Sequence, residues 1–238
     1  WMTAPQNPFV ARTLVNRVWA QLMGRGLVEP IDDMRDTNPS TNEPLLMALA
    51  QDFVTQRFDV RQLIRTITTS RVYGLSSQPN VSNARDTQNY SRAYRKRLGA
   101  EVLLDAVSDV TGDPHSFSGM PPGTRAVQLW DHRLPSSFLD TFGRPQRKTV
   151  CQCERVSETS LGQVLHLMNA PVVSDKISSP VGRASTLAAS ELSVDDILVE
   201  LYLATFGRPP RHAELPAARP PCPSEGSPRR SRAEDLLR

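Results

Sequence analysis

Two cysteines and one histidine are the residues of this chain whose types and spacing could carry chemistry. Cys151 and Cys153 are two positions apart, and His166 lies in the helix predicted to follow them. Converging thiolates and an imidazole can bind a soft divalent metal, and a thiolate beside a histidine base can act as a nucleophile or a redox centre. Because the chain has neither a Cys-X-X-Cys spacing nor a second cysteine pair, packed structural cysteines and a hydrogen-bonded core histidine are the favoured interpretation.

Charged residues surround these three candidates between positions 138 and 169. Glu154, Asp140 and His132 are candidates for a fourth metal ligand, and an arginine cluster around buried carboxylates would suit an acidic group of a substrate. The same charges can also pair with one another. The sequence lacks the motifs of covalent haem attachment, phosphate-binding loops, dinucleotide-binding turns, zinc-protease helices and nucleophile elbows. Their absence disfavours haem, nucleotide and common hydrolase chemistry in this chain.

Amphipathic helices must position this segment. Apolar residues recur at spacings of three and four between capping residues, prolines and glycines. This pattern predicts helices over roughly 8–23, 42–54, 59–73, 100–111, 138–142, 160–169, 184–189 and 193–206. Ser160 and Gln163 fit a capping box at the start of the helix that carries His166. The apolar stripe of this helix is expected to point inward and consists of Leu161, Val164, Leu165 and Met168.

The connections between these helices are long. Residues 113–135 contain enough apolar side chains to predict an ordered loop, with a short extended segment at 125–129. Residues 90–98 are basic, and the solvated start of a helix is favoured there over a contact with a phosphate or an acidic glycan. In the loop 26–42, Asp32, Asp33, Arg35 and Asp36 crowd together, and local ion pairs are favoured over a cation site or an acid–base pair.

The predicted fold class is mainly α, an irregular multi-helix domain of about seven helices with long ordered loops. We expect a single helical domain over residues 1–208, followed at 209–238 by a tail rich in proline and arginine that is disordered or aberrant. The formal net charge of +3 is small for 238 residues and predicts no nucleic-acid partner. No apolar run approaches the roughly 20 residues of a membrane span. The opening Trp1-Met2-Thr3 shows no leader and indicates a piece of a longer chain.

Several phrases in order resemble a planctomycete domain of unknown function, number 1553. They are NPFVARTLVNRVWAQLMGRGLVEPIDDMRDTNP, LIRTITTSRVYGLSS, RLGAEVLLDAVSDVTG, MPPGTRAVQL and SFLDTFGRPQRKTVCQCERVSETSLGQVLHLMN. The resemblance covers residues 1–210, beyond which the chain departs from the helical ending of that family. Its Cys-X-Cys-Glu-Arg phrase matches the segment 151–155, and its following helix matches Gln163, His166 and Asn169. The candidate binding residues are therefore Asp140, Arg144, Glu154, Arg155, Gln163 and Asn169.

The resemblance implies the C-terminal part of a long exported protein in the periplasm or cell envelope, often with a cytochrome c domain elsewhere in the same chain. It implies no established activity. We therefore expect an accessory binding or structural module whose partners are other domains of the parent chain. No haem is expected in the chain itself, and a divalent metal is the one candidate cofactor. The alternative is a hydrolytic or redox enzyme that acts on envelope or polysaccharide material, with Cys151, Cys153 and His166 as metal ligands or as nucleophile and base.

Overall fold

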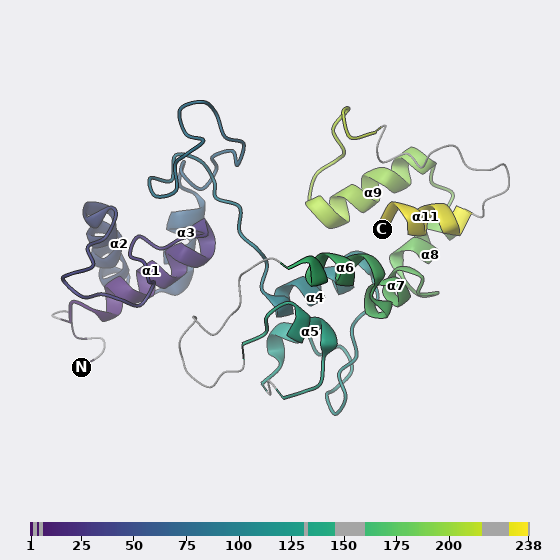
Figure 1. The fold of residues 1–238 in the computed structure, drawn as a ribbon, viewed down its shortest axis with the longest axis horizontal. Helices are drawn as coiled ribbons and strands as arrows, with labels where there is room; N and C mark the ends of the chain where they lie inside the picture. Colours follow the sequence, from purple (N-terminus) through teal and green to yellow (C-terminus); the bar gives the residue numbers. More distant parts are fainter. Residues whose placement is uncertain (2–3, 5–6, 131–132, 146–159, 216–228, 238) are drawn as a thin grey trace. The chain divides into compact units, whose positions relative to one another are not determined.

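A computed structural model describes residues 1, 4, 7–130, 133–145, 160–215 and 229–237 of the chain. Helices are the regular elements of these residues and no strand occurs among them, which confirms the mainly α class. The helices gather into two compact units, residues 1–96 and residues 97–238 (Figure 1). The sequence predicts one helical domain over 1–208, so the division after Lys96 is visible only in the structure.

The first unit is built from α1 (Val10–Met23), α2 (Glu43–Thr55) and α3 (Val60–Thr68), which pack on one another. Each helix contributes apolar side chains at spacings of three and four to one shared core. The edge of the Tyr90 ring packs against the Trp19 indole, with ring centroids 5.3 Å apart. The most buried side chains of this core are Val15, Trp19, Leu27, Val28, Leu46, Phe53, Leu63 and Ile67.

The predicted helix boundaries of this unit rest on local capping. Gly24 ends α1 with a left-handed φ of 85°, and its N–H donates to the carbonyl of Ala20 at 2.8 Å. Asn42 begins α2 by accepting from the Leu45 N–H, and Asp59 begins α3 by accepting from two backbone N–H groups. The predicted end of a helix at residue 23 and the predicted starts at residues 42 and 59 are therefore confirmed. The helix predicted to reach residue 73 ends at Thr68, since the next hydroxyl side chains donate back to the last carbonyls of α3.

Asn16 is fully buried, although the sequence places it off the apolar stripe of α1. Its Nδ2 donates to the carbonyls of Val28 (2.9 Å) and Ile31 (2.8 Å), and its Oδ1 accepts from the Val28 N–H (3.0 Å). The amide therefore holds the loop 26–42 on the helix. In the same loop, Arg35 pairs with Asp33, so the predicted local ion pairing is confirmed, and Asp32 pairs with Arg17 of α1.

Residues 90–98 are irregular coil and not the start of a helix, so the prediction for this segment is wrong. Its polar groups bind the end of α1 and the glycine turn that follows. The Tyr90 hydroxyl donates to the Gly26 carbonyl at 2.8 Å. The Lys96 Nζ donates to the carbonyls of Gln21 and Leu22 at 2.6 and 2.9 Å, as suits a cation at a helix C-terminus.

The second unit is arranged around α4 (Ala100–Thr111). It also contains η1 (Ala126–Gln128), α5 (Ser137–Thr141), α6 (Leu161–Asn169), α7 (Pro171–Ile177), α8 (Arg183–Ala189), α9 (Val194–Phe206) and α11 (Arg229–Leu237). Helix α4 contacts η1, α5, α7, α8 and α9, and α11 packs against α8 and α9. No helix is predicted from the sequence within 209–238, where α11 forms. The core of this unit is formed by Ala100, Leu104, Phe117, Ala126, Leu129, Phe138, Leu139 and Phe142.

The long loop 113–135 is ordered where it is described, as predicted, and a buried carboxylate anchors it. Asp105 Oδ1 accepts from the Ala126 N–H at 2.7 Å, and Oδ2 accepts from the Val127 N–H at 3.2 Å. Two consecutive amides pointing at one carboxylate require a turn. The segment is therefore the 3₁₀ turn η1 and not the extended stretch that the sequence predicts.

Candidate functional site

Helices α5 and α6 pack against each other and bring several predicted site residues into one neighbourhood of the second unit. Asp140 and Arg144 lie at the end of α5, and Gln163 and His166 lie on the inner face of α6. Asn169 is exposed at the far end of α6. The remaining candidates lie outside the described residues, and they are His132, Cys151, Cys153, Glu154 and Arg155.

Gln163 joins the two helices. The predicted capping box is confirmed, because Ser160 Oγ accepts from the Gln163 N–H at 3.3 Å and Gln163 Oε1 accepts from the Ser160 N–H at 3.2 Å. The Gln163 Nε2 donates to the Thr141 carbonyl at 3.0 Å, and its Oε1 accepts from Arg97 Nη2 at 2.7 Å. The buried amide is thus used to fix α6 on α5. Sequence reasoning missed Arg97, whose only signal is its place in the basic stretch 90–98.

The side chain of Arg144 is mostly covered, with 9% of it exposed. Its Nη1 donates to the Leu134 carbonyl at 2.8 Å, and its Nη2 pairs with Asp140 Oδ1 at 2.7 Å. The guanidinium holds the loop that leads into α5, while Asp140 is mostly exposed. Buried charges are costly to leave unpaired. In the described residues, this arginine therefore stabilises the fold and is already engaged by protein acceptors.

The His166 ring packs edge-on against two aromatic side chains of α5 and its end. The ring centroids lie 5.6 Å from Phe138 and 5.8 Å from Phe142. Its Nε2 is buried and has no hydrogen-bond partner in the described part of the chain. No group of three or more His, Cys, Asp or Glu side chains that could hold a metal ion occurs among the described residues. Of the predicted cysteine–histidine site, the described residues therefore include only the His166 nitrogen.

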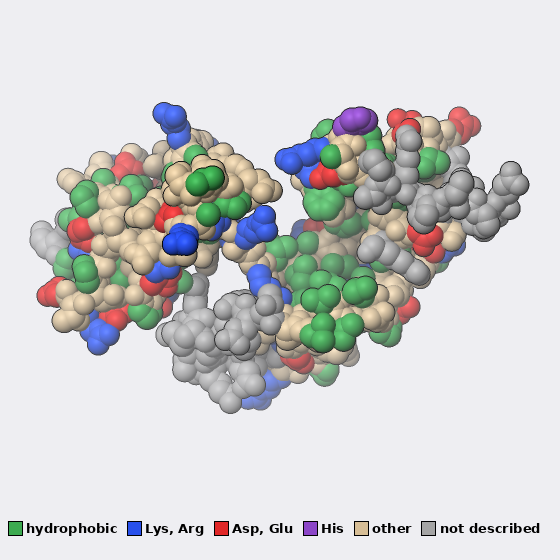
Figure 2. Space-filling model, turned by 45° about the horizontal axis from the view of Figure 1, so that its top comes forward, with side chains coloured by type: hydrophobic (Ala, Val, Ile, Leu, Met, Phe, Trp, Pro, Cys, Tyr) green, Lys and Arg blue, Asp and Glu red, His purple; other side chains and the backbone are tan. Residues whose placement is uncertain are grey.

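The outer face of α6 is apolar and exposed, and the prediction that its stripe points inward is wrong. The side chains opposite the stripe are the buried ones, since Gln163 binds Thr141 and Arg97 while His166 packs between phenylalanines. Figure 2 shows hydrophobic side chains gathered on the surface of the second unit. The α6 face, as we name it, consists of Leu161 (74% exposed), Val164 (52%), Leu165 (49%), Leu167 (39%) and Met168 (71%).

A cavity of about 430 Å³ opens beside the α6 face. Asn169 lines it, so this predicted site residue lies apart from the Arg144 and Gln163 neighbourhood. The cavity lies among α6, α7 and the end of α11, and most of its lining side chains are apolar. The lining residues are Leu167, Met168, Asn169, Val173, Ser174, Ile177 and Leu237.

The described helices include none with both the length and the apolar character that crossing a membrane requires. A family model described as "Protein of unknown function (DUF1553)", under the name PSD1, matches residues 1–220. No curated protein and no solved structure matches the chain. The matched stretch covers most of the 238 residues and includes α1 through α9. The chain therefore belongs to the PSD1 family of proteins of unknown function, DUF1553.

Proposed function

We propose that the chain is an accessory docking module of a larger exported cell-envelope protein, in which the α6 face packs against another domain of the same polypeptide. One observation carries the proposal: five large apolar side chains are exposed together on one short helix. Four of them recur at i, i+3, i+4 and i+7, the spacing with which a helix packs on a second apolar surface. Folded proteins seldom expose contiguous apolar patches without an interaction to cover them.

The chemistry of the α6 face favours a protein domain as its occupant. Helix α6 contains no Asp, Glu, Lys or Arg, so it offers nothing to a charged polymer. A nine-residue helix also presents too little area for tight association between separate molecules. Docking within one polypeptide needs less area, because the linker keeps the partner at high effective concentration. A cytochrome c domain in the same polypeptide is the partner that the family resemblance suggests.

Hydroxyl-radical footprinting of the native polypeptide that carries this chain tests the proposal. The radical oxidises exposed Met and Leu side chains, so covered positions are protected. We expect Met168 and Leu165 to be labelled several-fold less in the parent protein than in the isolated 238-residue chain. Val181, which is 74% exposed in the same unit and is not part of α6, serves as the matched control and keeps its labelling. Equal labelling of Met168 in both proteins would reject the proposal.

His166 supports a second candidate function, a hydrolytic or redox enzyme acting on envelope or polysaccharide material. Its Nε2 is buried and has no hydrogen-bond partner among the residues that the structure describes. Such a nitrogen would be suited to coordinate a metal together with Cys151 and Cys153, or to accept a proton from one of these thiols. Elemental analysis of the purified chain tests the metal form. A bound divalent metal is expected to be lost in both Cys151→Ser and Cys153→Ser, whereas unchanged metal content in these variants would exclude it.

A further inference from the structure

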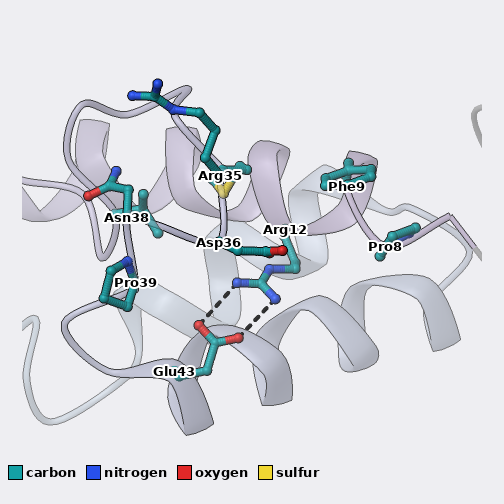
Figure 3. A pocket seen from close by; sticks show the side chains of 10 residues that line it. Pro8, Phe9, Arg12, Arg35, Asp36, Asn38, Pro39 and Glu43 are labelled. Carbon is teal, nitrogen blue, oxygen red and sulfur yellow. Dashed lines mark hydrogen bonds and ion pairs between the residues drawn. The ribbon is translucent and has the colours of Figure 1, made fainter.

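A second concave feature lies in the first unit, between the start of α1, the loop 34–39 and the start of α2 (Figure 3). Its volume is about 350 Å³, within the range of roughly 300–1,000 Å³ typical of small-molecule sites. Figure 3 shows Phe9 and Pro8 at one end, Asn38 and Pro39 at the other, and Arg12 with Glu43 between them. Val28 is among the lining residues and is buried.

An ion pair between two partly exposed side chains forms the middle of this cleft. Arg12 Nη1 lies 2.9 Å from Glu43 Oε1, and Arg12 Nη2 donates to Glu43 Oε2 at 3.0 Å. Such a two-bond pairing holds both planar groups in one orientation. The guanidinium retains further N–H donors and the carboxylate further lone pairs, so each can still bind a ligand hydroxyl.

The charges of the cleft disfavour an acidic ligand. Both of its arginines already have carboxylate partners, since Arg12 binds Glu43 and Arg35 binds Asp33. An anion would have to compete with a partner that is part of the fold. Asp36, a third carboxylate, also lies along the lining and is exposed.

The two ends of the cleft are of different kinds. Phe9 directly precedes α1 and is 57% exposed. A phenyl ring in solvent contributes less hydrophobic stabilisation than a buried one. Its backbone is held in place, because the Phe9 N–H donates to Asn7 Oδ1 at 3.0 Å. At the other end, Asn38 Nδ2 donates to the carbonyls of Glu29 and Asp33, which leaves the amide oxygen as an acceptor.

We propose that this cleft binds a neutral sugar unit of a glycan chain. A pyranose ring combines an apolar C–H face, which stacks on an aromatic ring such as Phe9, with an edge of neighbouring hydroxyls that both donate and accept. The Arg12–Glu43 pair presents a donor and an acceptor side by side to such an edge. Because the arginines are neutralised, the ligand is a neutral sugar and not a uronate or a phosphate. The site lies in the first unit and does not depend on the α6 face.

Calorimetric titration of the whole 238-residue chain tests the site with three neutral probes: cellohexaose, xylohexaose and mannohexaose. We expect at least one to bind, and Phe9→Ala to weaken that binding by about tenfold through loss of ring stacking. Arg12→Lys keeps the charge but removes the two-bond pairing, so it is expected to weaken binding as well. Both side chains are partly exposed, and circular dichroism confirms that the variants fold.

Phe206→Ala is the matched control, because Phe206 is 62% exposed and belongs to the second unit. It is expected to leave the affinity unchanged. Hexagalacturonate and hexalysine test the charge argument as acidic and cationic probes. Failure of all three neutral oligosaccharides to bind overturns the proposal. So does an equal loss in Phe206→Ala, or selective binding of hexalysine that Asp36→Asn abolishes, which would identify a site for cationic peptides.

Discussion

Helices α1 and α6 carry the same kind of apolar stripe, yet α1 buries its stripe and α6 exposes it. In α1, Val15, Trp19 and Met23 are buried in the core of the first unit. In α6, the corresponding row from Leu161 to Met168 faces outward. Periodicity alone does not distinguish these helices, because both repeat at three and four residues.

Each helix carries a buried, hydrogen-bonded amide on the face that it buries. Asn16 lies three and four positions before the buried Trp19 and Ala20, so its bonds to Val28 and Ile31 hold the amide and the stripe toward the same side. Gln163 lies across the helix from the α6 face, so its bonds to Thr141 and Arg97 turn the stripe outward. The comparison indicates that apolar periodicity alone does not decide which face a short helix buries, and that buried polar contacts mark the face that is covered.

The largest change in the free energy of unfolding is expected from a substitution at the centre of the buried stripe of α1. Trp19→Ala removes a large buried side chain and should lower the free energy of unfolding of the first unit by about 3–5 kcal/mol. Met168→Ala in α6 should change the second unit by less than about 0.5 kcal/mol. Urea unfolding, monitored by hydrogen exchange at the backbone amides of α1 and of α4, reports the stability of each unit separately. If Met168→Ala lowered the free energy of unfolding as much as Trp19→Ala does, the Met168 side chain would have to be buried and not exposed.

The two amides give the next largest effect. Asn16→Leu leaves the buried carbonyl and N–H of Val28 and the partly buried carbonyl of Ile31 without this partner, and we expect a loss of roughly 2–4 kcal/mol in the first unit. Gln163→Met should cost roughly 1–2 kcal/mol in the second unit and release α6 from α5. Radical labelling of Leu165 checks the release. If its labelling stays the same in Gln163→Met, another contact orients α6.

Two valines give the closest match between the stripes. Val15 is fully buried in α1 and Val164 is half exposed in α6. Removing two methyl groups should cost about 2 kcal/mol at Val15 and less than about 0.5 kcal/mol at Val164. Denaturant midpoints of Val15→Ala and Val164→Ala measure this difference, and similar midpoints would remove the distinction between the helices.

The smallest effect is expected from alkaline titration, and its sign differs between the units. Burial raises the pKa of Tyr90 to about 12, so the first unit should lose at most about 1.4 kcal/mol between pH 10 and 11. Burial lowers the pKa of Lys176, so Lys176 loses its proton at a lower pH in the folded second unit than in the unfolded chain. The free energy of unfolding of the second unit should therefore rise as pH rises toward 10.5.

Unfolding in urea at pH 9, 10 and 11 checks this opposition between the units. Tyr90→Phe should remove most of the fall in the free energy of unfolding of the first unit with rising pH. Burial also raises the pKa of Tyr94, which contributes in the same direction. A decline that persists at full size in Tyr90→Phe would assign it to another group.

The candidate site could be predicted only in part from the sequence. The proximity of Asp140, Arg144, Gln163 and His166 follows from their common segment, and the capping box at Ser160 is a local pattern. The partners of these residues were not predictable. Arg97 lies far from Gln163 in sequence, and a carbonyl such as that of Leu134 carries no side-chain signal. Cys151 and Cys153, the centre of the predicted chemistry, lie outside the described residues, and their role stays a prediction.

The phrase Thr-Phe-Gly-Arg-Pro, which occurs twice, separates local from tertiary control. After α5 and after α9, its glycine adopts a left-handed φ, 78° at Gly143 and 65° at Gly207. Both helices stop there because glycine adopts this backbone conformation without a steric penalty. The arginines that follow behave differently: Arg144 is mostly covered and donates to the Leu134 carbonyl, whereas Arg208 is partly exposed and pairs with Glu214.

The sequence by itself determined where most helices begin and end, because caps, prolines and glycines act over about four residues. Only the tertiary structure decided that the chain divides after Lys96, that Asn16 is buried and that the α6 stripe faces outward. Burial depends on groups that are distant along the chain, such as the Thr141 carbonyl and the Arg97 guanidinium for Gln163. The local pattern is the same whether or not such partners exist.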